Sequence, residues 1–387
     1  MTGDIMKTLE NAKMVLNIFK KHGYEAYIVG GAVRDHILHM PLSDIDITTN
    51  AKPHQVSKIF NTKPTGLKYG TVTVFFKDET FEVTTYRIDG PYEDDRHPER
   101  VTFSETVNED VMRRDFTMNG LLMNQNLEII DYVNGQLDIK AKFIRAIGDP
   151  YLRFSEDALR MLRAIYFQSK LGFQITKDTR EAMFDLSDKI KNVAMERVLV
   201  ELIKILKGKH LKRALKTMVT TEIHKVLPGL EKGIEFIAEQ NEMPFVDVFF
   251  TMCFALNKGI VPSKWTFSNK QRHRYVTASK LANQKTEFDA VDLYTYGIDL
   301  CLLASRVNYM LKRSRLMQNE LMEQYKQLPI QSVLDLKLKP HEMMEILNKK
   351  AGAWLKDMQQ KMVINILNKK LENNKEDLKD FLLKEMN

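Results

Sequence analysis

The pattern of this 387-residue chain changes near residue 150. Before that point, short strand-like runs rich in β-branched residues alternate with helix-like runs, whereas nearly every later segment has the spacing of an amphipathic helix. A single hydrophobic core rarely grows beyond about 250–300 residues, so more than one domain is expected. The pattern therefore predicts an α+β fold, with a small β-sheet and its helices at the start and all-helical domains behind it.

Composition narrows the class of protein. Hydrophobic residues make up 44% and charged residues 28%, which is typical of a folded globular chain. The net charge of +7 permits a polyanionic partner without requiring one. Two cysteines exclude a disulfide scaffold and a four-cysteine zinc site. The first residues lack the apolar core of a signal peptide, and the most apolar stretch, 246–256, is too short to cross a bilayer, so we expect a cytoplasmic protein without membrane contact.

The most informative run is IVGGAVRDHILHMPLSDIDITT, over 28–49. Its last part, 43–49, is predicted to be a strand, in which residues two apart point to the same side. Asp44 and Asp46 would then present two carboxylates together, with isoleucines on the buried face. Adjacent carboxylates repel each other unless a cation lies between them, and Mg²⁺ prefers such oxygen ligands.

A glycine pair precedes this strand. Gly30 and Gly31 lie between a predicted strand over 24–29 and a predicted helix, where glycine allows backbone N–H groups to approach an anion. Arg34 follows one turn later and can bind a phosphate oxygen. Separately, a glycine pair is usually a loop and an Asp-x-Asp usually a solvated turn, but together they predict a metal–triphosphate site.

This order of motifs resembles the nucleotidyltransferase superfamily that includes DNA polymerase β. The resemblance implies two metal ions, one activating the attacking hydroxyl and one holding the triphosphate, and often a third carboxylate from a neighbouring strand. Glu82, in the predicted strand 81–87, is the candidate, although an exposed strand glutamate would look the same. Arg87 ends that strand and either reaches a phosphate or pairs with an acid of the following loop.

Two later motifs are consistent with a nucleotide site. RRDFTMN begins a segment, 113–124, that we expect to be helical and to supply cations for phosphate and ribose. In SEDALRMLRAIYF, Ser155 is expected to cap a helix on which Asp157, Arg160 and Arg163 follow at spacings of three. By itself, that spacing equally fits a ladder of salt bridges.

Together the motifs Gly-Gly-x-x-Arg-Asp, Asp-x-Asp, Arg-Arg-Asp-Phe-Thr-x-Asn and Glu-Asp-x-x-Arg resemble class II tRNA nucleotidyltransferases and bacterial poly(A) polymerases, most clearly over the first 210 residues. The resemblance implies a catalytic head over 1–150, a neck over 151–207, a body over 208–270 and a tail over 271–387. It also implies that Asp44 and Asp46 bind Mg²⁺, and that the nucleotide is contacted by Gly31, Arg34, Arg114, Asp157, Arg160 and Arg163.

In that family, Asp157 and Arg160 would act as a protein template for the incoming base. A carboxylate suits the amino groups of cytosine and adenine, whereas uracil and guanine present oxygen acceptors at that position. The chain departs from the family at Tyr166, where relatives often have a further arginine. A phenol brings no charge, so the role of that arginine is not carried over to this chain.

The resemblance leaves several activities open. A loop over 89–103, expected to be mobile, is typical of members that add CCA from CTP and ATP, and argues against addition of CC alone. A mixed-charge C-terminus argues against a poly(A) polymerase, and addition of A alone stays open. The helical remainder would bind the 3′ acceptor end and elbow of tRNA, with the protein a monomer. A catalytically decayed RNA-binding protein would lack Asp44 or Asp46, and both are present.

Overall fold

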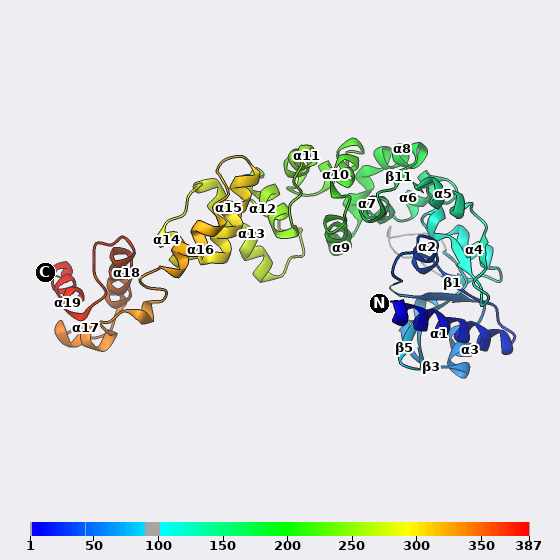
Figure 1. The fold of residues 1–387 in the computed structure, drawn as a ribbon, viewed down its shortest axis with the longest axis horizontal. Helices are drawn as coiled ribbons and strands as arrows, with labels where there is room; N and C mark the ends of the chain where they lie inside the picture. Colours follow the sequence, from blue (N-terminus) through cyan, green and yellow to red (C-terminus); the bar gives the residue numbers. More distant parts are fainter. Residues whose placement is uncertain (1, 43, 90–100, 387) are drawn as a thin grey trace. The chain divides into compact units, whose positions relative to one another are not determined.

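The computed structural model describes residues 2–42, 44–89 and 101–386. Contacts divide the chain into two compact units, the first formed by Met1–Met243 with Lys264–Thr266 and the second by Pro244–Ser263 with Phe267–Asn387. Within the described residues every strand belongs to the first unit, and the second is helical (Figure 1). The predicted α+β class is confirmed, while the finer division into head, neck, body and tail stays a prediction.

A seven-stranded sheet organises the first unit, with strand order β3-β4-β5-β2-β1-β8-β9. Strands β2 and β5 run parallel, and the other neighbouring pairs are antiparallel. The strands are β1 Ala26–Val29, β2 Asp46–Thr49, β3 Asn61–Gly66, β4 Thr71–Phe76, β5 Glu79–Thr85, β8 Leu121–Met123 and β9 Ile129–Asp131. Two-stranded sheets join β6 Arg87–Asp89 to β7 Val101–Phe103 and β10 Phe143–Ile144 to β11 Gln174–Ile175.

Helices pack on this sheet through apolar faces. The first helix of the chain buries Leu16 and Phe19 and packs on β1 and β5. The second and third helices pack on β1 with β8 and on β3 with β4, respectively. The helices of this region are α1 Thr2–Lys21, α2 Gly31–Ile37, α3 Pro53–Ile59, α4 Val107–Met112 and α5 Gly135–Ala141.

The strand that carries the aspartates lies inside the sheet, between β1 and β5. Ile45 and Ile47 are buried, so Asp44 and Asp46 face the opposite side, as predicted. The strand itself begins only at Asp46, however, and Asp44 lies in the segment before it. The alternation of burial therefore starts before the backbone pairing does.

The helix predicted over 113–124 is wrong. Helix α4 ends before it, at Met112, and Thr117–Asn119 form a single 3₁₀ turn. Phe116 is extended and bridges Ala146, and β8 then pairs with β1 and β9. The residues of β8 are all buried, so sheet pairing and burial outweigh the helical propensity of Leu and Met.

The chain also breaks at Asp157, where a single helix from Ser155 was expected. Asp157 has extended backbone angles and ends α6, while its side chain accepts the N–H of Leu159 at the start of α7. Ser155 lies inside α6 and does not cap a helix. The remaining helices of the first unit are α6 Pro150–Glu156, α7 Leu159–Leu171, α8 Lys177–Asp185, α9 Met195–Leu206, α10 Leu211–Thr220 and α11 Glu231–Glu239.

Helices alone build the second unit in the described chain. Its C-terminal part has its own core, which includes Met343, Met362 and Leu378 and against which the half-buried Trp354 packs. The helices are α12 Val246–Leu256, α13 Asn269–Gln284, α14 Ala290–Tyr296, α15 Ile298–Met310, α16 Gln318–Lys326, α17 Pro340–Ile346, α18 Ala353–Leu367 and α19 Lys375–Met386. Among the described residues, no helix combines the length and apolar character needed to cross a membrane.

Candidate functional site

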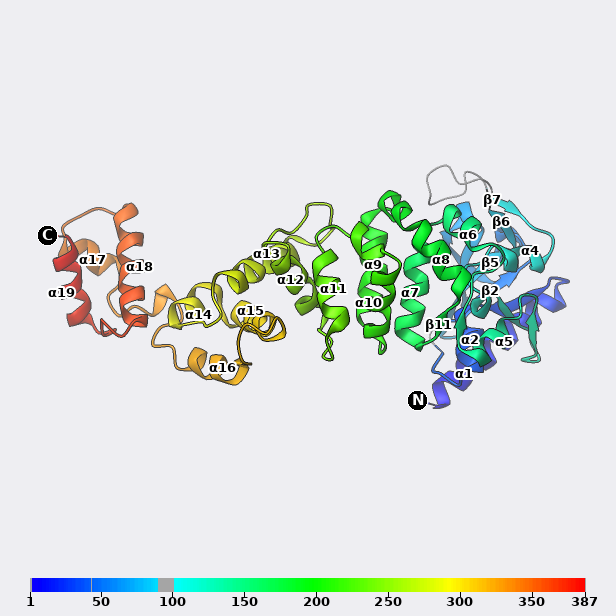
Figure 2. The same cartoon turned by 90° about the horizontal axis from the view of Figure 1, so that it is seen from above.

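A polar pocket of about 770 Å³ lies within the first unit and collects most of the predicted site residues. One side is formed by the end of β1, the start of β2 and α2, and the other by α7 and α9, which lie side by side (Figure 2). All predicted site residues except Glu82 line it: Gly31, Arg34, Asp44, Asp46, Arg114, Asp157, Arg160 and Arg163.

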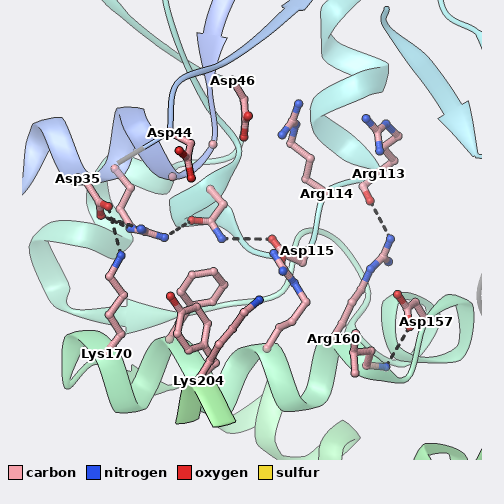
Figure 3. A pocket seen from close by; sticks show the side chains of 18 of the residues that line it. Asp35, Asp44, Asp46, Arg113, Arg114, Asp115, Asp157, Arg160, Lys170 and Lys204 are labelled. Carbon is pink, nitrogen blue, oxygen red and sulfur yellow. Dashed lines mark hydrogen bonds and ion pairs between the residues drawn. The ribbon is translucent and has the colours of Figure 1, made fainter. Parts of the chain in front are cut away.

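The carboxylate pair lies at the sheet side of the pocket (Figure 3). Glu82 is paired in register with Asp46 on the parallel strand β5 and is exposed, but it does not line the pocket. Loss of water around the carboxylate, followed by repulsion from Glu82 and Asp44, raises the pKa of Asp46 to about 6, although Arg114 opposes the shift. This unbalanced negative charge is what a divalent cation would neutralise, so the residues present fit a Mg²⁺ site.

The glycine pair forms the turn between β1 and α2. Gly30 has φ 74° and ψ −130°, a positive-φ conformation that residues with a side chain rarely adopt. Its N–H donates to Leu121 O of β8 at 3.3 Å, which ties the turn to the sheet. Gly31 begins α2 and lines the pocket beside Arg34.

Arg34 is buried and fixed by a chain of polar contacts. Its Nε donates to Asp35 Oδ1 at 2.8 Å, and its Nη1 donates to Asn119 Oδ1 at 2.7 Å. Lys170 of α7 approaches the other oxygen of Asp35 at 3.3 Å. The guanidinium also lies over the ring of Phe167, 5.1 Å from its centroid. Arg34 is thus held in one orientation toward the pocket.

The RRDFTMN segment supplies two further cations despite lacking the predicted helix. Asp110, fully buried, accepts from Arg113 at 2.7 Å and from Arg114 at 2.9 Å. Burial by itself raises the pKa of Asp110, but the two guanidinium groups outweigh it and hold that pKa below its usual value. The carboxylate therefore stays ionised and fixes both arginines at the pocket.

Asp115 of the same segment holds Arg163. Arg163 Nη2 and Nε lie 2.6 and 2.7 Å from Asp115 Oδ2, and Asn119 donates to Oδ1 at 3.3 Å. Burial would raise the pKa of Asp115, but Arg163 and these hydrogen bonds lower it. Asp115 and Asn119 therefore connect the anchors of Arg34 and Arg163 (Figure 3).

The predicted base-reading residues lie at the α6–α7 break. Arg160 donates to Glu156 at 2.7 Å and to the carbonyls of Arg153 and Arg113 at 3.1 Å. Asp157 pairs with Arg197 of α9 at 2.8 Å. Asp157, Arg160 and Arg163 therefore do not form a salt-bridge ladder with one another. Asp157 pairs with Arg197, Arg160 with Glu156 and Arg163 with Asp115.

Tyr166, the position that departs from the family pattern, lines the pocket with a cation beside it. Lys204 Nζ lies 5.8 Å from the centroid of the Tyr166 ring and pairs with Glu201 at 2.8 Å. A positive charge is thus present next to the phenol, supplied by α9.

Several pocket residues were not predicted as site residues. The motifs Gly-Gly-x-x-Arg-Asp and RRDFTMN contain three of them, Asp35, Asp115 and Asn119, so these residues could have been predicted from the sequence. Lys170 and Arg197 belong to no motif, and only the folding of α7 and α9 brings them to the pocket. Arg87 also lines the pocket and donates to Tyr69 O at 2.7 Å. Most of the loop predicted over 89–103 lies outside the described residues, and its flanks form β6 and β7.

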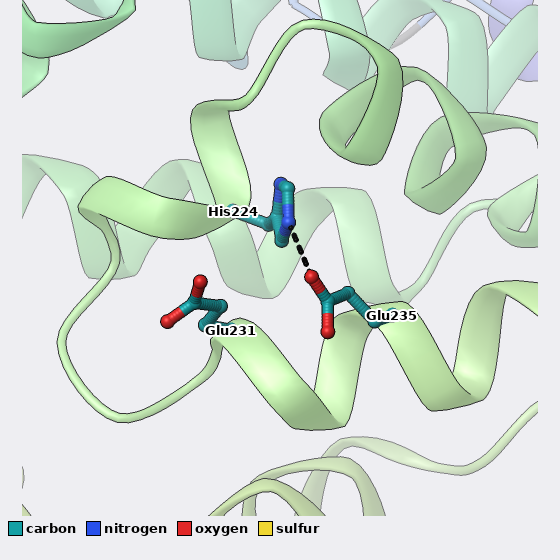
Figure 4. A group of neighbouring side chains, drawn as sticks. All are labelled: His224, Glu231 and Glu235. Carbon is teal, nitrogen blue, oxygen red and sulfur yellow. Dashed lines mark hydrogen bonds and ion pairs between the residues drawn. The ribbon is translucent and has the colours of Figure 1, made fainter.

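A second group of metal-binding residue types lies away from this pocket. His224, Glu231 and Glu235 are the one such group found in the described part of the chain (Figure 4). His224 is buried, with one ring nitrogen 3.1 Å from Met218 O and the other 3.1 Å from Glu235. Both nitrogens are therefore satisfied as they stand, and the ring connects α10, the 3₁₀ turn Ile223–Val226 and α11.

Comparisons with known proteins cover most of the chain. Residues 26–145 match the Poly A polymerase head domain, residues 172–234 the probable RNA and SrmB-binding site of polymerase A, and residues 248–382 a putative tRNA nucleotidyltransferase domain 2. The CCA-adding enzyme of Bacillus cytotoxicus is 37% identical over 97% of this chain and 98% of its own length. That of Listeria innocua is 37% identical over 95% and 96%.

Solved structures agree with the sequence comparisons. The Bacillus stearothermophilus CCA-adding enzyme in complex with CTP superposes with a TM-score of 0.82, at 31% identity and over 97% of both chains. The Thermotoga maritima CCA-adding enzyme complexed with tRNA has a TM-score of 0.66 at 18% identity, over 97% of this chain and 94% of that one, which shows a shared fold.

Proposed function

This chain belongs to the family of CCA-adding enzymes, and from that premise we propose that it adds C, C and A to the 3′ end of tRNA, using CTP and ATP. The observation that carries the proposal is the joint presence of Asp44–Asp46 and Asp157–Arg160 in one pocket. The first pair suits a metal-bound triphosphate, and the second suits the edge of a base. No nucleic-acid template is needed if protein groups read that edge.

Asp44 and Asp46 are proposed to hold Mg²⁺, with Glu82 as a further carboxylate on the neighbouring strand. Bound there, Mg²⁺ would neutralise triphosphate charge and favour ionisation of the attacking hydroxyl. Arg34 and Arg114 face the same pocket and supply fixed positive charge for the phosphates. The 3′ oxygen of tRNA bonds to the α-phosphorus, and the bond from that phosphorus to the bridging oxygen of pyrophosphate breaks.

Asp157 and Arg160 are proposed to select the base. An ionised carboxylate only accepts hydrogen bonds, so it suits the amino group of cytosine or adenine. Uracil and guanine would present an oxygen lone pair to it. Arg160 only donates, and its contacts with Glu156 and two carbonyls keep its guanidinium in one plane. Arg163, fixed by Asp115, is proposed as a further nucleotide contact.

Binding of tRNA is proposed to use exposed cations outside the pocket. Lys207 and Lys209 follow α9 and are exposed. Two lysines of the following helix, α10, are engaged locally: Lys216 lies 3.8 Å from Glu239, and Lys212 donates to Asn241 at 3.0 Å. Contacts of lysine with phosphates would position the RNA by shape and not by sequence.

The test is an extension assay on three tRNA transcripts, ending before CCA, after C and after CC. Each is incubated with CTP, with ATP and with both, and the 3′ ends are sequenced. Growth of every transcript to CCA, followed by a stop, is the expected result. Addition of A to the CC-ended transcript alone would identify an A-adding enzyme, a long A tail a poly(A) polymerase, and binding without extension a decayed RNA-binding protein.

A further inference from the structure

Both oxygens of the Asp157 carboxylate are held before any nucleotide arrives. Oδ1 accepts the backbone N–H of Leu159 at 3.0 Å, and Oδ2 accepts Arg197 Nη2 at 2.8 Å. Arg197 Nη1 lies 3.5 Å from Oδ1, so the two nitrogens of the guanidinium face the two oxygens of the carboxylate. Such a two-point contact fixes the plane of a carboxylate, which one hydrogen bond cannot do.

Arg197 is carried by a helix that packs closely on its neighbour. The residue lies in the first turn of α9, which contacts α7 and contains the buried residues Val198 and Leu202. Asp157 lies at the break between α6 and α7, where it is no longer held by helical backbone on both sides. The arginine side chain is 24% exposed and the aspartate side chain 16%, so the pair is partly shielded from water.

The pairing matters because discrimination at Asp157 depends on the direction of its lone pairs. A carboxylate that rotates would no longer direct its lone pairs at the amino group of cytosine or adenine, so the preference for these bases over uracil and guanine would fall. The two-point contact with Arg197 opposes such a rotation of the carboxylate. Of the roughly four lone-pair sites of a carboxylate, one remains for the amino group of the base after the contacts with Leu159 and both Arg197 nitrogens are made.

We propose that Arg197 is a positioning residue for base selection, acting through Asp157 and not through the nucleotide. This inference rests on the proposed function, because it assumes that Asp157 reads the base. Arg160, the other reading residue, is positioned by Glu156 and by two carbonyls, so the two reading groups have separate supports.

The test measures single-nucleotide incorporation into a tRNA transcript that lacks CCA. We compare kcat/KM for CTP with kcat/KM for UTP in the wild type, Arg197→Gln and Arg197→Lys. The Gln variant is expected to lower the CTP/UTP ratio by about 10-fold or more, the scale of one good side-chain contact to a base. The Lys variant keeps the charge but loses the two-point contact, so an intermediate ratio is expected.

Two controls separate positioning from a general loss of structure. Lys191→Gln removes a surface cation that pairs with Asp188 outside the pocket, and the ratio should stay at the wild-type value. In an Asp157→Asn background, Arg197→Gln should lower the ratio no further, because the group it positions has already been changed. Melting temperatures confirm that each variant is folded.

The outcomes that overturn the inference are specific. An unchanged ratio in folded Arg197→Gln would do so, as would a further loss of equal size in the Asp157→Asn background. A wild type that does not prefer CTP to UTP would instead contradict the proposed function. The two failures are therefore distinguishable.

Discussion

The cations of the pocket owe their positions to individual carboxylates. Asp110 holds Arg113 and Arg114, and Asp115 holds Arg163. A buried carboxylate paired in this way stays charged at neutral pH, and removing it would leave its arginine without a counter-charge. These paired aspartates therefore stabilise the fold and fix the cations of the pocket, whereas Asp46 lies near Glu82 and Asp44 and is proposed to bind a cation.

That difference predicts the behaviour of Asp46→Asn. The variant should abolish nucleotide incorporation, because it removes a carboxylate of the proposed Mg²⁺ site. It should be at least as stable as the wild type, because the raised pKa of Asp46 shows that its charge is unfavourable there without a cation. Labelled CTP incorporation and urea denaturation without Mg²⁺ measure the two effects. Retained turnover would refute the metal assignment.

The paired aspartates predict a loss of stability in acid. The pKa values of Asp110 and Asp115 are lowered in the folded protein, so these groups stay ionised where the unfolded chain takes up protons. Their contribution is complete above the pKa of unfolded aspartate, about 3.9, and is lost as the pH falls from there through the lowered folded values. Urea denaturation should show the free energy of unfolding falling over that range, and less steeply in Asp115→Asn. Equal slopes would contradict the assignment.

At the scale of the element, the turn from β1 into α2 depends on one backbone conformation. Gly30→Ala should lower the free energy of unfolding by about 1–3 kcal/mol, the cost of this positive-φ conformation for a residue with Cβ. No clash contributes, because the added Cβ would lie 3.8 Å from its nearest neighbour. Gly31→Ala is the matched control. Its φ is not in that region and its Cβ would lie 3.6 Å from Arg34, so little change in stability is expected. Equal effects of the two substitutions in urea denaturation would contradict this explanation.

Sequence patterns predict an element only where its conformation is determined by local periodicity. The period of two over 81–87 predicted β5, because this strand buries every second residue, Phe81, Val83 and Thr85. The helix predicted over the RRDFTMN segment was wrong because the conformation of this segment depends on pairing with strands elsewhere in the chain. The same holds for the pocket. The motifs predicted Asp157 as a site residue, whereas its partner Arg197 is 40 residues away and belongs to no motif.

For the whole molecule, the net charge of +7 does not show how many cations are available to RNA, because many lysines are paired with nearby carboxylates. Lys177 and Lys191 are exposed but lie near Glu181 and Asp188, at 3.6 and 2.6 Å. An RNA phosphate is attracted by cations whose charge is not already balanced, so the number of lysines overstates the binding surface. This distinction allows charge-matched variants to be compared.

The last prediction concerns the salt dependence of tRNA affinity. Each phosphate contact releases a counterion, so Lys207→Gln/Lys209→Gln should weaken binding and lower the slope of log Kd against log salt by about 1–2. Lys177→Gln/Lys191→Gln removes the same charge from balanced positions and should leave the slope unchanged. Filter binding of a tRNA transcript over a salt series, without nucleotides, measures both. Equal slopes in the two double variants would show that net charge, and not the segment after α9, governs the encounter with RNA.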